Sequence, residues 1–496
     1  MVKIKRNHSL LLIIALSIIF IASWQYKILR SSISDDYVGK KFARRDATGL
    51  NFPVAASFTY FYYYLNFYPV TTQKEYLDYS KEHAQKLFGD PRVPLNADNS
   101  YYILWGEHGK SLILLFDAFL KQSPQTLTLK NFNYLFFSFT LILLLIFAVT
   151  CKQAVLGIVL VLFMGSNPFL IYELYGRENI FGLGGAVVLF SVALLLPLIF
   201  EKKELGKYYL FIVPVLLGLF FGLIAHIRTE YLVVMLSCIL VFLFARSIDS
   251  KKKILIITIF LLSFVGFTKA VEVYFNRLIE RTYTQLQKTG RTIQDMQESR
   301  TNYHSFWQPF YLGLSDFDNK YGITWSDAAA YKNAEKYLLI KYPEKYKALD
   351  NRELWSVQRE YNEFLRCQTL LLIKTDPLWY LTIIGKRIFT LFNEVVPLGL
   401  AVGSDFFKIP FSGWLLLPSM ILFGIKKKFN YLIVLLFPLS LSIPIVAIHS
   451  AKGITSLTVY HMFNAAVIIS FIINYLYKSQ FIRGLFSRVF ERLKLF

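Results

Sequence analysis

The 496-residue chain is poor in cysteine, poor in acidic residues and free of internal repeats. Its three cysteines, Cys151, Cys238 and Cys367, form no CxxC pair and no zinc-type spacing. Only Cys367 falls in a segment that we expect outside the membrane, so an intramolecular disulfide on that side is excluded. No heptad array or low-complexity linker occurs, which argues against a coiled coil or a solenoid.

The chain is rich in apolar residues. Hydrophobic residues make up 55% of it, aromatic residues 17%, and the mean hydropathy is +0.43. The apolar residues gather in runs of about 17 to 21, the length that crosses a hydrocarbon core. This pattern predicts a polytopic membrane protein. The net charge of +21 then reflects Lys and Arg in cytoplasmic loops and near anionic headgroups, and we expect no nucleic-acid partner.

The first apolar run, Ser9 to Leu29, follows Lys3, Lys5 and Arg6, which predicts a cytoplasmic N-terminus. It is long for a signal peptide and no small-x-small cleavage site follows, so we interpret it as a retained anchor. Further spans are predicted at 132–150, 154–171, 183–200, 208–226, 231–245, 254–270, 408–425, 430–448 and 459–477.

The basic loops fit this set of spans. Lys and Arg follow each even-numbered span, near Cys151, Glu201, Arg246, Lys426 and in the tail from Lys478. The positive-inside rule therefore predicts about ten spans, with both termini on the cytoplasmic side of a bacterial plasma (inner) membrane. The segment 378–403 is interrupted by a Lys-Arg pair, and we interpret it as an amphipathic helix on the outer surface plus a short apolar piece. If it crosses, the count becomes eleven.

The predicted fold is thus all-α, with two large extracytoplasmic loops that contain juxtamembrane helices. The predicted parts are a first anchor (1–30), a first outer loop (31–131), spans two to seven (132–270), a large outer loop or cap (271–407), spans eight to ten (408–477) and a basic cytoplasmic tail (478–496).

Two adjacent acids follow the first span, in "RSSISDDYVGKKFARRD". Asp35 and Asp36 either end that span with a polar cap, or hold a carboxylate at the membrane surface as a general base or a divalent-cation ligand. The sequence requires no metal and leaves open whether one takes part. After the acids, the tyrosine-rich segment 52–69 and the segment 103–121 predict surface helices that would form a lid.

This order of features resembles the GT-C superfamily of membrane glycosyltransferases, notably glycosyltransferase family 39 with its protein O-mannosyltransferases. The resemblance covers most of the chain as architecture, and as a motif it rests on "SDDY" (Ser34 to Tyr37). It implies a polyprenyl-phosphate-linked sugar donor, an acceptor whose identity the sequence leaves open, and an active site on the outer face. It also implies that Asp35 or Asp36 is the general base.

Two short outer loops carry further candidates. Arg177 and Glu178 either pair with each other in a solvated loop or place an acid and a phosphate-binding cation opposite the first loop. Arg228 and Glu230 lie in a tight turn at membrane level, where ionisable residues tend to be functional. Arg228 either holds a lipid phosphate or snorkels to headgroups and pairs with Glu230.

The late outer loop supplies the remaining candidates. His304 and Trp307 lie in an aromatic stretch in which Trp307 either stacks on a sugar or belongs to the core of a folded cap. Lys386 and Arg387 are placed for an anionic lipid, or simply snorkel at the membrane surface. "DFDNKYG" lacks the glycine and the glutamate of a calcium loop. The alternatives to glycosyl transfer are a flippase or transporter for a lipid-linked saccharide, and a polymerase or ligase of surface polysaccharide.

Overall fold

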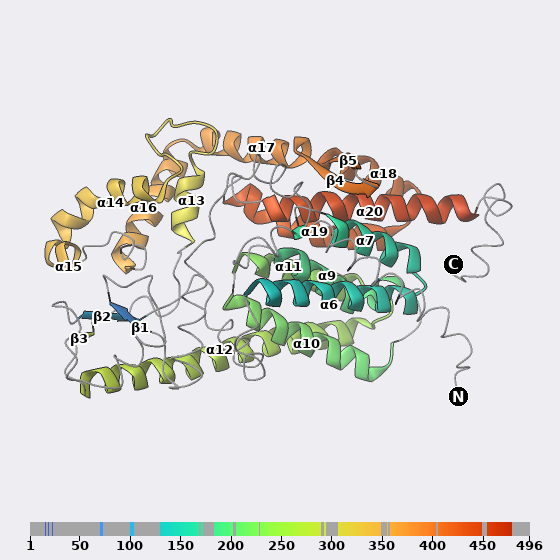
Figure 1. Cartoon of the computed structure of the whole chain (residues 1–496), viewed down its shortest axis with the longest axis horizontal. Coiled ribbons are helices and arrows are strands. Elements are labelled where there is room, and N and C mark those ends of the chain that lie inside the picture. Colours follow the sequence, from blue (N-terminus) through green and yellow to red (C-terminus); the bar gives the residue numbers. More distant parts are fainter. Residues whose placement is uncertain are drawn as a thin grey trace.

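The computed structural model describes residues 15, 18, 22, 70–72, 100–103, 129–167, 170–171, 183–201, 205–227, 229–288, 292–293, 306–348, 355, 358–402, 405–448 and 454–478. The apolar helices are α6 (Leu129–Thr150), α7 (Ala154–Ser166), α9 (Leu183–Phe200), α10 (Lys207–Ala225), α11 (Val234–Phe244, preceded by the 3-10 turn η5, Thr229–Val233), α12 (Ser250–Lys288), α18 (Leu416–Ile425), α19 (Phe429–Ala447) and α20 (Ile454–Lys478). They pack side by side as one bundle (Figure 1).

Five of these helices contain segments long and apolar enough to cross a membrane: Leu183–Phe200, Lys207–Ala225, Ser250–Gln285, Phe429–Ala447 and Leu457–Leu476. Four shorter apolar segments, Leu135–Thr150, Ala154–Ser166, Thr229–Phe244 and Gly413–Ile425, lie where spans were predicted. The chain is therefore a helical membrane protein, as its composition indicates. The first predicted span lies outside the described residues except at positions 15, 18 and 22.

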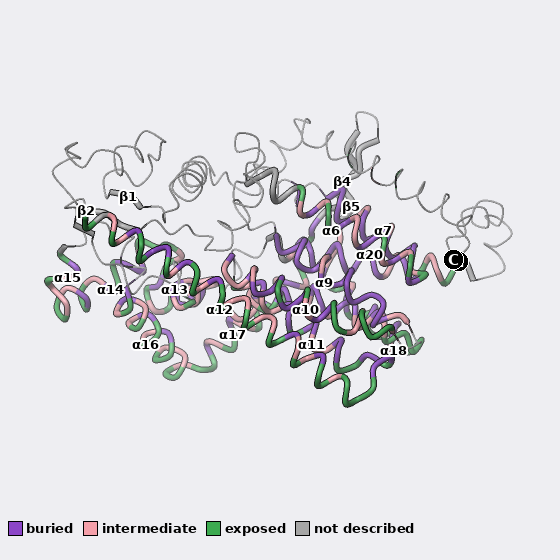
Figure 2. The backbone as a smooth tube through the Cα atoms, turned by 90° about the horizontal axis from the view of Figure 1, so that it is seen from below, coloured by how far each residue is buried: buried purple, intermediate pink, exposed green. Residues whose placement is uncertain are grey.

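Burial divides the bundle into a centre and a periphery (Figure 2). In α9, 89% of the apolar segment is buried inside the protein, whereas in α12 only 17% is. The helix that is buried all round therefore occupies the middle, and α12 lies on the outside, where its apolar side chains suit lipid. Gly218 lets α10 approach α12 closely, because a Cβ there would lie 2.5 Å from the Phe260 carbonyl oxygen.

The turns that the positive-inside rule places in the cytoplasm meet at one end of the bundle. Tyr431 at the start of α19 donates to Gln153 (3.4 Å) and packs its ring on Phe200 (5.5 Å) and Phe423 (5.3 Å). Residues from three predicted cytoplasmic turns are thus in contact. Lys426 lies nearby over the ring of Tyr475, close to the end of α20.

At the other end, α12 continues past the bundle (Figure 1). The predicted span ended at 270, but the helix runs to Lys288, because its later charged side chains are exposed to water and still favour a helix, with pairs such as Lys269 and Glu272 (2.6 Å). It leads to a small sheet of β1 (Val70–Thr72), β2 (Ser100–Ile103) and β3 (Thr292–Ile293). β1 and β2 are antiparallel, and β2 and β3 are parallel.

A second sheet interrupts a predicted span. The segment 408–425 was expected to be helical, but its first residues belong to β5 (Asp405–Ser412), which pairs with β4 (Val395–Val402) as a hairpin. Val, Phe and Ile suit a strand as well as a membrane helix, so hydropathy alone does not separate the two. Pro397 lies opposite Pro410 in the register. Two-stranded pairing tolerates both prolines because each strand has a free edge.

Five helices that follow β3 and precede β4 in the sequence build a cap, which we define as residues 306–393. They are α13 (Trp307–Gly313), α14 (Asp327–Lys341), α15 (Pro343–Ala348), α16 (Arg359–Thr375) and α17 (Pro377–Asn393). The cap has its own core, separate from that of the bundle, which includes Tyr311, Leu338, Tyr361 and Trp379. A helix, α17, occupies the first part of the segment where an amphipathic helix was expected, and Leu391 near its end belongs to the core of the bundle. α17 therefore connects the two cores.

Candidate functional site

The junction between the cap and the bundle is the part of the described structure where charged and aromatic side chains gather. Its centre is Arg387 on α17, whose side chain is fully buried. Its Nε donates to Asp316 Oδ2 at 2.8 Å, its Nη1 to the Val446 carbonyl at 3.1 Å and its Nη2 to the Gly313 carbonyl at 2.6 Å. One guanidinium thus ties the loop after α13 to α17 and to the end of α19.

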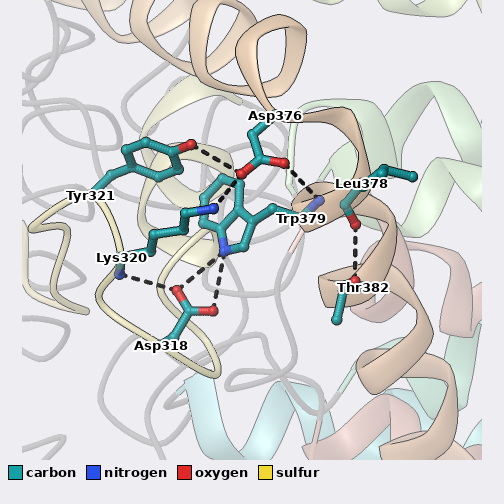
Figure 3. A network of polar contacts seen from close by, with 7 residues as sticks. All are labelled: Asp318, Lys320, Tyr321, Asp376, Leu378, Trp379 and Thr382. Carbon is teal, nitrogen blue, oxygen red and sulfur yellow. Dashed lines mark hydrogen bonds and ion pairs between the residues drawn. The ribbon is translucent and has the colours of Figure 1, made fainter.

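In the loop after α13, every second residue from Asp316 to Lys320 contacts α17. Besides Asp316, Asp318 accepts from the indole Nε1 of Trp379 at 3.1 Å, and Lys320 pairs with Asp376, the N-cap of α17 (Figure 3). Asp376 also accepts from the Trp379 backbone N–H at 3.1 Å. The ammonium of Lys320 and this N–H lower the pKa of Asp376. "DFDNK" therefore binds a helix, and both of its aspartates are occupied by N–H donors.

Aromatic side chains form a row on the side of the cap nearest the bundle. Trp307 and Phe310 of α13 stack at 6.0 Å and 19°, Phe306 meets Trp307 edge-on at 5.1 Å, and Phe310 lies 6.1 Å from Tyr380 of α17. Tyr380 in turn donates to the Ala447 carbonyl of α19 at 3.4 Å. We call Phe306, Trp307, Phe310 and Tyr380 the aromatic row. Phe306 is exposed and Trp307 and Phe310 are half-buried, so part of the row lies at the protein surface.

Two of the predicted binding residues are adjacent on α17 but differ in environment. Lys386 is exposed, and its Nζ lies 5.7 Å from the centre of the Phe317 ring. Arg387 is buried with all three nitrogens bonded within the protein. Of the pair, Lys386 is therefore the one able to reach a lipid phosphate without a rearrangement of the cap.

The other predicted site residues divide between described and undescribed parts of the chain. Trp307 begins α13, and Glu230 is half-buried in η5, at the end of the bundle nearest the cap. The remaining predictions, Asp35, Asp36, Arg177, Glu178, Arg228 and His304, lie outside the described residues. Among the described residues, no group of three His, Cys, Asp or Glu side chains is placed to hold a metal ion.

His461 is a junction residue that the sequence did not single out. Buried on α20, its Nδ1 lies 3.1 Å from the Phe411 carbonyl of β5, and its Nε2 lies 3.1 Å from the Leu391 carbonyl of α17. The only signal in the sequence is a histidine within an apolar span, which is rare and costly in a membrane. The imidazole fixes the base of the β4–β5 hairpin to the bundle.

The sequence matches no protein-family model, and its comparison with curated proteins and with solved structures gives no match.

Proposed function

We propose that this chain is a membrane glycosyltransferase that moves a sugar from a polyprenyl-phosphate carrier to an acceptor on the extracytoplasmic face. The acceptor oxygen attacks the anomeric carbon as the bond to the carrier phosphate breaks, so the configuration inverts. Asp35 or Asp36 takes the acceptor proton, and the carrier leaves as a phosphate anion. Because phosphate is a good leaving group, the protein supplies mainly positioning, a base and cations.

The observation that carries this proposal is the pairing of the two long loops. β2 belongs to the predicted first outer loop and β3 to the predicted late outer loop, and Ser100 pairs with Thr292, Tyr101 with Ile293. The two loops therefore meet at the end of the bundle opposite the contacts of Tyr431. Such a joint body at one membrane face supports the placement of an acid from the first loop near groups of the cap.

The junction offers the other two elements that the reaction needs. The aromatic row has ring faces suited to a sugar, since apolar C–H faces of a ring stack on aromatic side chains. Lys386 is an exposed cation on the same helix as Tyr380, suited to the negative charge that develops on the departing phosphate. The proposed step requires no divalent cation at the acid pair.

The flippase or transporter alternative finds less support. Transporters commonly place charged residues near the middle of their spans to bind cargo. The interiors of the apolar segments α7, α9, α11 and α19 contain no Asp, Glu, Lys or Arg. A polysaccharide polymerase or ligase uses a related lipid-linked donor, and the distinction lies in the acceptor and in the need for the acid pair.

The decisive assay uses the full-length protein in proteoliposomes with radiolabelled polyprenyl-phosphate hexose and membranes of the native cell as acceptor source. We expect labelled acceptor and free polyprenyl phosphate in equal amounts. Asp35→Asn or Asp36→Asn should lower the rate by about 100- to 10,000-fold, the usual loss for a general base. Glu363→Gln, at an exposed acid of α16, is the matched control and should leave the rate unchanged.

Two outcomes contradict the proposal. Full activity in the Asp35→Asn, Asp36→Asn double variant would leave the two aspartates as a polar end to the first span. Movement of intact donor across the bilayer without release of polyprenyl phosphate would identify a flippase instead.

A further inference from the structure

We propose that α17 and α18 form one interrupted membrane span, with the β4–β5 hairpin inserted at the break, and that one side of this composite span faces lipid acyl chains. α18 has ten residues, which at about 1.5 Å per residue cover about 15 Å, half of a hydrocarbon core of about 30 Å. Another element must complete the crossing. This inference does not depend on the proposed glycosyl transfer.

The end of α17 is in direct contact with Ser412, Gly413 and Trp414, the residues that lead into α18. Ser412 Oγ donates to the Phe392 carbonyl at 2.7 Å, and Trp414 Nε1 donates to Asn393 Oδ1 at 2.6 Å. Gly413 between them packs against α17 so closely that a Cβ would lie 2.4 Å from the Leu391 carbonyl oxygen. The end of α17 is thus joined to α18 through η8 (Gly413–Leu415), although a hairpin separates them in sequence.

The bonds at this break are those that a helix end inside a membrane needs. The last carbonyls of a helix have no partner within it, and lipid offers them none. Here the Phe392 carbonyl accepts from the Ser412 hydroxyl, and the Leu391 carbonyl lies 3.1 Å from His461 Nε2, which donates to it in the Nε2–H tautomer. Irregular backbone is tolerated at membrane depth where protein covers it. Val396 in β4 is accordingly buried, and the ring of Phe411 in β5 packs on Phe163 of α7 (5.6 Å).

A continuous apolar stripe runs down the outward side of the two helices. Its members are Ile388 and Phe389 of α17, Trp414 of η8 (Gly413–Leu415), and Leu417, Ile421 and Ile425 of α18, each at least 40% exposed. Phe389 and Trp414 join the two halves, with ring centroids 6.1 Å apart. Leu417, Ile421 and Ile425 are four residues apart in α18 and so lie on one face of that helix, which Trp414 of η8 continues.

Bilayer lipid is the occupant that these observations favour. The lower half of the stripe belongs to a short apolar segment at the position of a predicted span, so the upper half is continuous with a membrane-facing surface. At its upper limit, Lys386 is the nearest exposed charge, one turn before Phe389, as expected of a lysine that reaches the headgroups. The outer boundary of the hydrocarbon core therefore crosses α17 between Lys386 and Phe389.

Spin-label accessibility in proteoliposomes of the full-length protein tests this directly. Of the three cysteines only Cys367 is exposed, so Cys367→Ser provides the background. Labels are placed at Phe389→Cys and Ile421→Cys, with Leu262→Cys on the exposed face of α12 as the lipid control and Glu363→Cys as the water control. We expect positions 389 and 421 to match 262, with frequent collisions with oxygen and few with a water-soluble nickel chelate.

A label at 389 that the nickel chelate reaches as readily as one at 363 would overturn the interrupted span. Low accessibility to both reagents, with dipolar broadening between labels, would also overturn it, because a second copy of the chain would then cover the stripe. Ile388→Cys provides a second label on the same stripe if Phe389→Cys fails to elute as a folded protein.

Discussion

Asp316 and Arg387 form an ion pair from which water is excluded, with side chains 1% and 0% exposed, although 71 positions separate them in the sequence. The pair joins the loop after α13 to α17, and two further bonds from Arg387 satisfy buried carbonyls. Removal of one partner would leave the other as an uncompensated buried charge.

We therefore expect Asp316→Asn and Arg387→Met each to lower the free energy of unfolding by about 3–5 kcal/mol, the usual range for breaking a buried pair. Denaturant titration in detergent micelles provides the measurement. The double variant should lose less than the sum of the two single variants, because neither charge is then left alone. Strict additivity would show that the two residues do not interact as a pair.

The exposed pair of Arg366 and Glu363 on α16 is the matched control. Its side chains are 47% and 52% exposed, and such pairs contribute about 0–1 kcal/mol. Arg366→Met should therefore leave the free energy of unfolding almost unchanged. If Arg366→Met and Arg387→Met lowered the free energy of unfolding equally, the effect of Arg387→Met would come from the loss of arginine packing rather than from the buried charge.

The sequence predicted the helices of the bundle well where apolar runs were long. The predictions 183–200 and 430–448 correspond to α9 and α19 within one residue at each end. The reason is that a membrane span needs only length and apolarity, and both can be read locally. The start of the helix expected at 378 was predicted equally well, since α17 begins at Pro377.

What the sequence could not predict depends on contacts between distant residues. Nothing near Arg387 indicates that its partner is Asp316 rather than a lipid phosphate, so it was interpreted as a binding residue. The second half of β5, from Lys408, was interpreted as part of a span because Ile409 and Phe411 suit either structure. Its actual state is set by pairing with β4, and pairing is not a local property.

Acid should weaken the attachment of the loop to α17 through Asp376. Its pKa lies below the ordinary value of 3.8 because of Lys320 and the Trp379 N–H. A depressed carboxyl pKa contributes stability that is present above the ordinary value and is lost as the pH falls through the folded-state pKa. We expect Asp376→Asn, which keeps an N-cap side chain, to lower the melting temperature at pH 7, and the difference to vanish at low pH.

A melting-temperature series from pH 7 to pH 2 on both proteins checks this expectation. A difference that stays constant over the whole range would show that the amide fails for a reason other than charge. Lys320, the partner of Asp376, contributes to stability in a different pH range. Its pKa is raised, chiefly by Asp376. Its contribution is present below the ordinary lysine value of 10.5 and is lost as the pH rises further.

Gly413 should tolerate substitution poorly, because it lies against the backbone of α17. A Cβ there would lie 2.4 Å from the Leu391 carbonyl oxygen and 2.8 Å from the Phe392 Cα, both backbone atoms. Gly413→Ala must therefore separate α17 from η8, at a cost of about 1–3 kcal/mol, typical of overpacking. Gly424→Ala in α18, where nothing lies within 4 Å of the added Cβ, is the control and should be neutral. Thermal unfolding in micelles compares the two, and equal melting temperatures would contradict close packing at the break.

The arrangement of the spans predicts which loops face the cytoplasm. A reporter fused after Lys253 should report the cytoplasm, because that residue lies in a lysine-rich turn, Lys251 to Lys253, at the start of α12. A reporter near Gly290 should report the outside, because α12 crosses in between. The measurement is a pair of fusions, one to a reporter active only in the cytoplasm and one to a reporter active only outside it.

A third fusion, after Lys428, tests the composite span in the same assay. If α17 and α18 cross once between them, the chain passes from an outer cap to the cytoplasm between Pro377 and Ile425, and the reporter at Lys428 should be cytoplasmic. If α17 lies wholly on the surface and α18 fails to cross, Lys428 should instead report the same side as Gly290. A cytoplasmic signal at Gly290 would reverse the cap, place the aromatic row and Lys386 away from any extracytoplasmic donor, and so contradict the proposed site as well as the topology.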